Sequence, residues 1–233
     1  MILSIDVGIK NLSFCVLAPH VVDWGIIDIS ESEEHLCHCN KKATYKTNDA
    51  KYCNKHKPKF PIIKDKMKKS DYMKLNEELK ETKKKEEWIE TIRTSNTFLF
   101  PLKKNASEMN LVNISKNIQT NFDNKGWDKP LFQKVIIENQ ISPLASRMKT
   151  IQGMITQYFI KNSEIHFVSS ANKLKESTQK LTYAERKKEG VRLCREKLAQ
   201  GEWKDFFEKS KKKDDLADCY LQGLWFIANK MEK

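Results

Sequence analysis

The sequence predicts one mixed α/β core that is interrupted by an inserted segment of different composition. Three observations predict this fold class: three short apolar runs near the N-terminus, alternating helical and strand-like patterns after residue 107, and a cysteine- and lysine-rich stretch between them. A chain of 233 residues can form one sizeable core plus a small appendage. We therefore expect a single domain over residues 1–233, with an insertion at 36–105.

The first three elements are expected to be strands of an antiparallel meander. Apolar runs at 2–7, 12–17 and 21–29 are separated by short turn signals such as Gly8 and Pro19. The composition then changes to clustered cysteine and histidine, followed by a lysine-dense stretch that predicts an exposed helix or mobile arm.

The second half predicts helices and strands in alternation. Apolar residues recur at helical spacing, β-branched runs mark strands, and Ser-Pro supplies a helix cap and a first-turn proline. The expected elements are a helix at 109–122, a strand at 134–138, a helix from 142 to 159, a strand at 164–168, and helices at 183–199 and 213–230.

The charge of the chain favours a polyanionic partner. Its formal net charge is +12 and its pI is about 9.3, so nucleic acid is the first partner to consider, although a solvated lysine-rich surface gives the same balance. No apolar run reaches the length of a membrane span, and the opening MILSIDVG resembles a core strand more than a targeting segment. The six cysteines suit metal and core positions in a reducing compartment.

Two carboxylates end core strands. Asp6 closes the first apolar run just before Gly8, and Glu138 closes the run KVII. A buried strand rarely ends in a carboxylate without a partner, because an unpaired buried charge is costly. Asp6 could instead cap the turn or pair with Lys10, and Glu138 could simply reach solvent.

Three more carboxylates open the last helix. Asp214, Asp215 and Asp218 lie within its first turns, and Asp214 and Asp218 extend the apolar stripe of that helix by i, i+4 spacing. Interaction with the helix dipole accounts for acids at an exposed helix start. It does not explain why Asp218 continues the apolar stripe. Carboxylates brought together in this way repel one another unless hard cations such as Mg²⁺ neutralise them.

Four segments, IDVGIKN, IIENQ, SRMKTIQG and KKKDDLADCYLQG, resemble the motifs of RuvC-type Holliday junction resolvases. The resemblance is to the branch with fungal mitochondrial cruciform-cutting enzymes and the resolvases of poxviruses and other large DNA viruses. It covers most of residues 1–30 and 107–230. It implies a ribonuclease-H-like sheet flanked by helices, and a homodimer that nicks two strands of a four-way junction with Mg²⁺ or Mn²⁺.

The resemblance assigns roles to the acids. Asp6 matches the first-strand aspartate that would bridge two metal ions, Glu138 the glutamate after the fourth strand, and Asp218 the last aspartate of the C-terminal motif. The partner of Asp218 is Asp215 by the DxxD spacing or Asp214 by i, i+4 spacing, and both remain open. Two such ions can activate a water and stabilise the leaving oxygen.

Cations near these elements are candidates for DNA contacts. Lys10, Arg147, Lys149 and Lys173 lie close to the expected catalytic elements, and the resemblance implies that SRMKTIQG helps to bind the junction. Ordinary surface cations are the alternative. Two-fold symmetry of the substrate suits a C₂ dimer. An apolar face of the expected helix from 142 to 159 could form its interface or belong to the core; this face comprises Met148, Ile151, Met154, Ile155 and Tyr158.

The insertion carries a pattern typical of structural zinc. Cys37, Cys39, Cys53 and His56 form two close pairs, which fit tetrahedral Zn²⁺, and His38 could replace one cysteine. Few apolar residues lie nearby, so this segment would need a metal to fold.

Three functions compete. The first is resolution of four-way junctions in branched DNA. Another ribonuclease-H-like activity, on RNA–DNA hybrids or of the transposase type, would use the same acids. A non-catalytic zinc-containing DNA-binding protein would explain the charge but not the acids. The resemblance favours a viral replication site in the cytoplasm of an infected cell, with a mature organellar enzyme as the alternative.

Overall fold

The computed structural model describes residues 1–30, 35–63, 97–102, 109–140, 146–174 and 182–230, together with 68, 70, 71, 74, 87, 90, 92, 94 and 95. The chain divides into two compact units. The core unit comprises Met1–Glu31 and Met109–Lys233, and the inserted unit comprises Ser32–Glu108.

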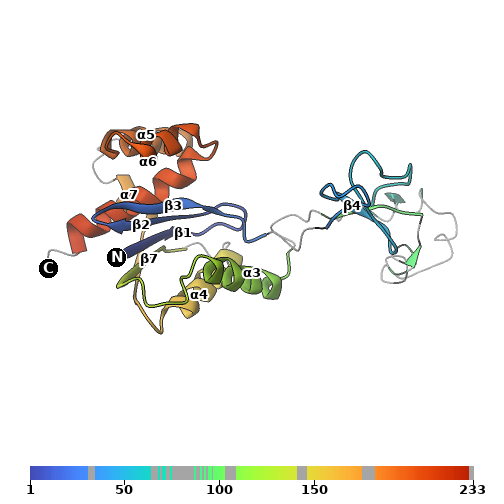
Figure 1. The fold of residues 1–233 in the computed structure, drawn as a ribbon, viewed down its shortest axis with the longest axis horizontal. Coiled ribbons are helices and arrows are strands. Elements are labelled where there is room, and N and C mark those ends of the chain that lie inside the picture. The colour runs from blue at the N-terminus through green and yellow to red at the C-terminus, as the bar shows by residue number, and fades with distance from the viewer. Residues whose placement is uncertain are drawn as a thin grey trace. The chain divides into compact units, whose positions relative to one another are not determined.

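The core unit is built on a five-stranded mixed sheet (Figure 1). Its strands are β1 (Ile2–Asp6), β2 (Leu12–Ala18), β3 (His20–Ile27), β7 (Lys134–Glu138) and β8 (Glu164–Val168). The spatial order is β3-β2-β1-β7-β8, with β1, β2 and β3 antiparallel and β7 and β8 parallel to β1. This order, with helices on both faces, is the sheet of a ribonuclease-H-like fold.

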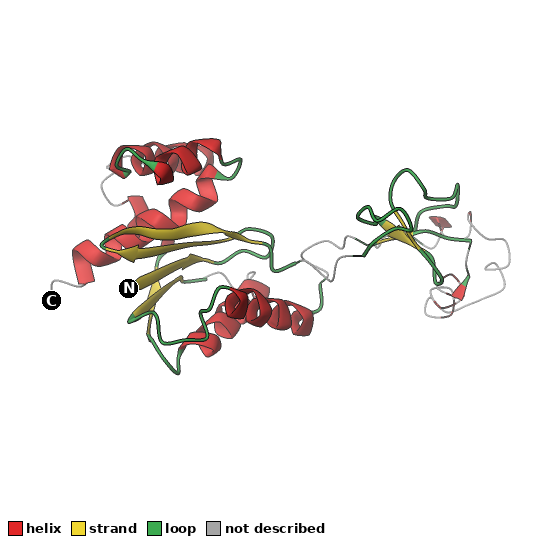
Figure 2. Ribbon diagram, in the orientation of Figure 1, coloured by secondary structure: helices red, strands yellow, loops and turns green. Residues whose placement is uncertain are grey.

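Five helices flank the strands (Figure 2). They are α3 (Leu111–Asn124), α4 (Ser146–Phe159), α5 (Tyr183–Lys197), α6 (Glu202–Lys209) and α7 (Lys213–Lys230). The N-termini of α3 and α5 are capped by local side chains, an asparagine that accepts a backbone N–H and a Thr-x-x-Glu capping box. Figure 1 shows α5, α6 and α7 on one face of the sheet and α3 and α4 on the other.

Alternation along β2 separates the two layers of the core. Cys15 and Leu17 pack with α5, α6 and α7, and Trp24 of β3 joins this cluster by stacking on Phe207, with ring centroids 5.5 Å apart. Phe14 points to the opposite face, toward the aromatic cluster of α3 and α4. Each face of the sheet is thus buried by its own helices, which fixes the positions of the strand ends.

The inserted unit contains a small antiparallel sheet, in the order β5-β4-β6. Its strands β4 (Tyr45–Lys46), β5 (Lys51–Tyr52) and β6 (Phe100–Pro101) have two residues each. Such strands provide too little pairing to fold alone, so other interactions must hold them. Across the described residues of the chain, no helix combines the length and apolar character of a bilayer span.

Most expected elements are confirmed. The strands at 134–138 and 164–168 and the helix at 213–230 have the expected bounds. The expected cap at 142–143 and most of the lysine-rich arm lie outside the described residues. Helix α6 was not predicted from the sequence, and the remaining strands and helices differ at their ends by a few residues. Ile151 and Ile155 are fully buried, so this part of the α4 face belongs to the core of the chain.

Candidate active site and metal centre

The two strand-end acids lie side by side. Strands β1 and β7 are parallel, and their register pairs Ile5 with Ile137, so the next position places Asp6 beside Glu138 at a strand spacing of about 4.8 Å. Ser4 faces α7, and alternation along β1 therefore directs Asp6 to the same face. Both carboxylates are partly buried.

Helix α7 runs antiparallel to β1, and every fourth residue of the helix lies opposite every second residue of the strand. Phe226 packs in one cluster with the start of β1, and one turn earlier Gln222 donates to Ser4 Oγ at 3.2 Å. Two strand residues span about 6.6 Å and four helix residues about 6.0 Å, so the same step continues to the next pair. We therefore expect Asp218 on the helix to lie opposite Asp6 on the strand.

The start of α7 is fixed to the sheet by two hydrogen bonds. Ser13, which is paired with Asp6 in the β1–β2 register, donates its hydroxyl to the carbonyl of Asp215 at 2.6 Å. Trp24 Nε1 donates to the carbonyl of Leu216 at 3.2 Å. These bonds hold the first turn of α7 over the carboxyl ends of β1 and β7.

Asp214 and Asp215 have different surroundings. Lys187 Nζ lies 2.5 Å from Asp214 Oδ2, and although burial opposes the charge, this contact lowers the pKa of Asp214. Burial, and then the charges of Asp214 and Asp6, raise the pKa of Asp215 above its ordinary value of 3.8. Its Oδ2 is buried and has no hydrogen-bond partner among the described residues. The charge of Asp6 thus acts on Asp215, whereas Asp214 forms an ion pair with Lys187.

A basic groove of about 890 Å³ begins at Asp214. It lies between α5 and the turn from α6 to α7, and its cations outnumber its single acid. Four of them, Lys188, Arg195, Lys209 and Lys211, are exposed. The sequence indicated basic character in these segments but not the groove that they form. The cationic residues that line it are Lys187, Lys188, Arg195, Lys209, Lys211 and Lys213.

The predicted DNA-binding cations have varied surroundings. Lys149 Nζ lies 3.0 Å from Asn139 Oδ1, next to the end of β7, and is exposed. Arg147 instead donates to a backbone carbonyl ahead of α3, so its guanidinium is partly engaged within the chain. Lys10 is half-buried in the loop after β1. Lys173 belongs to a 3₁₀ turn that packs against α7, and its side chain lies outside the description.

The four predicted zinc ligands converge in the inserted unit. The ligand atoms of Cys37, Cys39, Cys53 and His56 all lie within 4.8 Å of one another and form a group that could hold a metal ion. The Cys39–Cys53 sulfurs are 3.8 Å apart, and His56 Nδ1 lies 3.7 Å from the sulfur of Cys37. A tetrahedral zinc with bonds of about 2.3 Å to sulfur separates two sulfurs by about 3.8 Å, so the donor set and spacing fit Zn²⁺.

The backbone around these cysteines favours the deprotonated ligands that a cation needs. Asn40 adopts a left-handed conformation, with φ of 59°, directly after the first cysteine pair. Burial raises the pKa of the Cys37 thiol, but the backbone N–H groups of Cys39 and Cys53 and the His56 ring outweigh it, and the pKa falls to about 6. His38 lies outside the group of four and stacks on His56, with ring centroids 4.5 Å apart.

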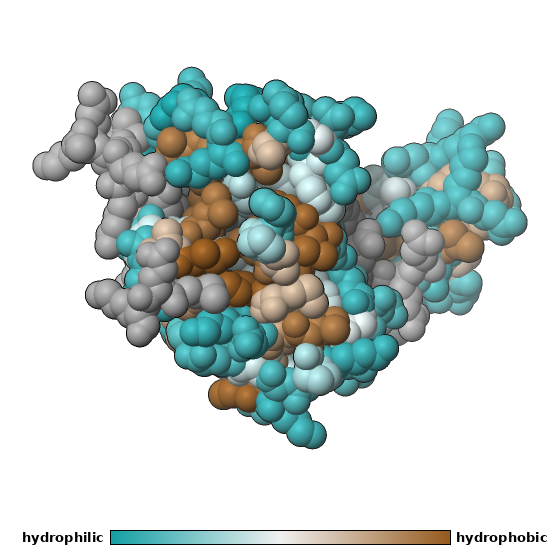
Figure 3. All heavy atoms as spheres, turned by 60° about the vertical axis from the view of Figure 1, so that its left-hand side comes forward, coloured by the Kyte–Doolittle hydropathy of each residue, from teal (hydrophilic) through white to brown (hydrophobic). Residues whose placement is uncertain are grey.

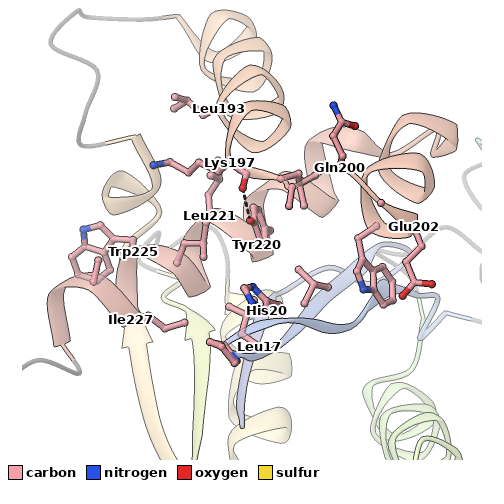
Figure 4. Close-up of a pocket in the computed structure, with 18 of the residues that line it drawn as sticks. Leu17, His20, Leu193, Lys197, Gln200, Glu202, Tyr220, Leu221, Trp225 and Ile227 are labelled. Atoms are coloured by element: carbon pink, nitrogen blue, oxygen red, sulfur yellow. Dashed lines mark hydrogen bonds between the residues drawn. The ribbon is translucent and has the colours of Figure 1, made fainter.

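A separate cavity of about 810 Å³ lies along the C-terminal half of α7 (Figure 4). Leu17, Leu221 and Trp225 line it, and Tyr220 Oη donates to the carbonyl of Lys197 at its wall. Figure 3 shows one face of the molecule, with hydrophobic side chains gathered in its middle and hydrophilic side chains around them. None of the predicted site residues whose side chains the structure describes lines this cavity.

Two family models match the chain. The family model described as Poxvirus A22 protein matches residues 87–230, and the model described as Mitochondrial resolvase Ydc2 / RNA splicing MRS1 matches residues 2–99. An uncharacterized protein of Acanthamoeba polyphaga mimivirus is 25% identical over 318 aligned positions, covering 100% of this chain and 75% of that protein.

Among solved structures, fowlpox virus resolvase in complex with its substrate Holliday junction DNA aligns with a TM-score of 0.44 and 14% identity, covering 97% of this chain and 96% of that chain. The Poxvirus A22 model covers more than half of the chain. The chain therefore belongs to the poxvirus A22 protein family, a family of Holliday junction-resolving endonucleases.

Proposed function

We propose that this chain cuts four-way DNA junctions by metal-dependent phosphodiester hydrolysis at a centre formed by Asp6, Glu138, Asp215 and Asp218. One observation carries the assignment. The buried Oδ2 of Asp215 has no hydrogen-bond partner among the described residues, and the charge of Asp6 helps to raise its pKa. A buried carboxylate with acidic neighbours is unfavourable unless a cation compensates it.

The donor set suits Mg²⁺ or Mn²⁺. All four ligands offer carboxylate oxygens, and hard divalent cations prefer oxygen. A pair of such ions, once bound, would activate a water and stabilise the leaving oxygen of an in-line displacement. Two observations support this arrangement of the acids: β1 and β7 are parallel neighbours that end together, and Ser13 on β2 is hydrogen-bonded to the start of α7.

Asp214 has a different role in this proposal. Its contact with Lys187 ties α5 to the start of α7, so it supports the neighbouring Asp215 rather than holding an ion. The basic groove that begins at Asp214 would accept the DNA backbone leading to the acids. Lysine and arginine contacts to phosphates position DNA without reading its sequence, which suits an enzyme that recognises the shape of a junction.

The symmetry of the substrate supports a homodimer. A four-way junction has two equivalent strands to cut, and a C₂ dimer presents two equivalent centres to them. Lys10, Arg147, Lys149 and Lys173 remain candidates for further backbone contacts. The viral relatives favour a site of viral DNA replication in infected-cell cytoplasm, and the match to the mitochondrial resolvase model keeps an organellar setting as the alternative.

The inserted unit is proposed to bind one structural Zn²⁺ through Cys37, Cys39, Cys53 and His56. Four protein ligands complete a tetrahedral shell and leave no open position, so this metal would organise the fold rather than take part in hydrolysis.

Cleavage assays test the proposal. The zinc-loaded chain should nick a four-way junction when Mg²⁺ is added, and cut the linear duplex and an RNA–DNA hybrid much less. Asp6→Asn should bind the junction and not cut it. Preference for the hybrid would favour the other ribonuclease-H-like activity. Binding without Mg²⁺-dependent cutting by the parent protein would favour a non-catalytic DNA-binding role.

A further inference from the structure

One part of the inserted unit, residues 35–63, has a strongly one-sided charge. Residues 35–63 contain seven lysines and one acidic residue, Asp49. A surface that serves solubility alone interleaves both signs of charge, so this excess calls for another explanation. Six of the lysines are exposed: Lys41, Lys42, Lys46, Lys51, Lys55 and Lys59.

We propose that this unit binds the phosphate backbone of duplex DNA through its lysine-bearing sheet, so that it holds an arm of the junction. The inference rests on the proposed junction-cutting function and adds a second DNA-binding surface to it. It concerns a surface in the inserted unit, separate from the acids and the basic groove of the core unit.

The register of the small sheet places two lysines opposite each other. Lys46 of β4 pairs directly with Lys51 of β5, and both are exposed. No described carboxylate pairs with either lysine, and Lys51 Nζ lies 3.0 Å from the ring nitrogen Nδ1 of His35. Like charges at directly opposed positions destabilise a strand pair. An anion bound across both lysines would remove this repulsion.

The metal explains how the unit can keep this unfavourable pair. A structural zinc strongly stabilises the folded state of a small domain. With a metal bound by Cys37, Cys39, Cys53 and His56, the unit could stay folded while its sheet carries concentrated positive charge. The opposed lysines do not stabilise the strand pair themselves, so their placement is better explained by an interaction with another molecule.

Aromatic side chains occupy the adjacent register position. Tyr45 and Tyr52 pair there and are half-exposed, and by strand alternation they point to the face opposite Lys46 and Lys51. The Nζ of Lys57 lies 4.6 Å from the centre of the Tyr45 ring, and Phe60 is 37% exposed. Cations and tyrosine hydroxyls are common partners of phosphate oxygens. The excess of exposed lysines over acids is complementary to the phosphate backbone of duplex DNA, which is the substrate class proposed for the core unit.

Salt dependence provides the measurement. Each phosphate contact contributes about 0.9 to the slope of log K against log salt. If Lys46 and Lys51 both contact phosphates, Lys46→Gln/Lys51→Gln should lower this slope by about 1.8. The parent protein would then lose about 12-fold more affinity than the variant between about 50 and 200 mM salt. Binding is measured on the zinc-loaded full chain without Mg²⁺, with a junction and with a linear duplex.

A matched control removes the same charge elsewhere. Lys129 and Lys161 are exposed and lie in the loops before β7 and β8, at the opposite sheet edge from the acids. Lys129→Gln/Lys161→Gln should leave the slope unchanged. Zinc content and resistance to a chelator should be equal or greater in Lys46→Gln/Lys51→Gln, because the repulsion is gone, while its DNA affinity falls. Lys46→Arg/Lys51→Arg should restore the parent slope.

The outcomes separate the two proposals. An unchanged slope and affinity in the zinc-loaded Gln variant, or an equal loss in the control variant, would overturn the inference. A third result would also overturn the inference: polyglutamate inhibits the protein through these lysines, while DNA binding does not depend on them. That result would indicate an acidic protein as the partner. Cutting with Mg²⁺ and excess enzyme tests the nuclease separately, and the Gln variant should cut at the parent rate under these conditions.

Discussion

The two neighbouring aspartates at the start of α7 allow a paired test of the proposed metal centre. Asp214→Asn and Asp215→Asn remove the same charge from adjacent residues. Without a divalent cation, Asp215 opposes folding at pH 7, because its folded-state pKa is raised above the ordinary 3.8. Its contribution is fully present below pH 3.8 and is lost as the pH rises through the raised pKa. Asp215→Asn should therefore leave the metal-free core at least as stable as the parent at pH 7.

The sign is opposite for Asp214. Lys187 lowers its pKa below 3.8, so its carboxylate stabilises the folded state above that pH and the contribution is lost as the pH falls through the lowered pKa. Asp214→Asn should therefore lower the melting temperature at pH 7. The pair of variants thus predicts opposite changes in the metal-free protein.

Added Mg²⁺ should raise the melting temperature of the parent and of Asp214→Asn more than that of Asp215→Asn. An ion that binds only the folded state at ten times its Kd stabilises it by about 1.4 kcal/mol. For a chain of this size, that raises the melting temperature by about 3–6 °C. The parent and Asp214→Asn should show this increase, and Asp215→Asn should lose most of it together with at least about 100-fold of the nicking rate, more than the loss of an outer-shell partner.

Tryptophan fluorescence can follow the core unit, because four of the five tryptophans, all except Trp88, lie in it. Nicking of a four-way junction is measured on the same preparations. Loss of the Mg²⁺ response in Asp214→Asn, with the response retained in Asp215→Asn, would refute the assignment of Asp215 as the ligand.

Three further predictions concern the scaffold. Gly8→Ala should lower stability by about 1–3 kcal/mol or more, because the new Cβ would lie 2.4 Å from the carbonyl oxygen of Asn11; thermal unfolding measures this loss. Gly223→Ala should also destabilise, since its Cβ would lie 2.6 Å from a leucine methyl, whereas Gly190→Ala, with open space in helix α5, should stabilise by about 0.5–1 kcal/mol. Cys53→Ser should abolish zinc binding, measured by elemental analysis, and leave the melting temperature of the core unit unchanged.

The elements that the sequence predicted best are those whose signal is local. Strand 134–138 is a continuous apolar run ended by Glu138, and helix 213–230 carries its own apolar stripe, so each is defined within its own residues. Helix α6 has only eight residues, and its burial depends on Phe207 meeting Trp24 of a distant strand. Periodicity over so short a segment cannot indicate such a contact.

The candidate site divides in the same way. The four Cys/His residues, whose ligand atoms lie within 4.8 Å of one another, could be predicted because spacing and residue type identify them, and the strand-end acids were proposed on the same grounds. Our proposal of Asp215 over Asp214 could not come from the sequence, because it depends on Lys187, a residue on another helix that contacts Asp214. The contact of the Arg147 guanidinium with a backbone carbonyl ahead of α3 could not be predicted either, because the two residues are far apart in the sequence.

The opposed charges of the molecule couple metal binding to DNA binding. The chain is strongly basic, yet the proposed cutting centre is a group of carboxylates, and a phosphate entering it would be repelled unless cations were already present. Each cation bound there should therefore raise the affinity for the junction, and by thermodynamic reciprocity the junction should raise the affinity for the cation by the same factor. The basic groove and the lysines of the inserted unit are not subject to this coupling between metal and DNA, since they attract phosphate without a divalent ion. They can hold the substrate before the metal centre is complete, which places metal-dependent cutting after recognition of the branched DNA.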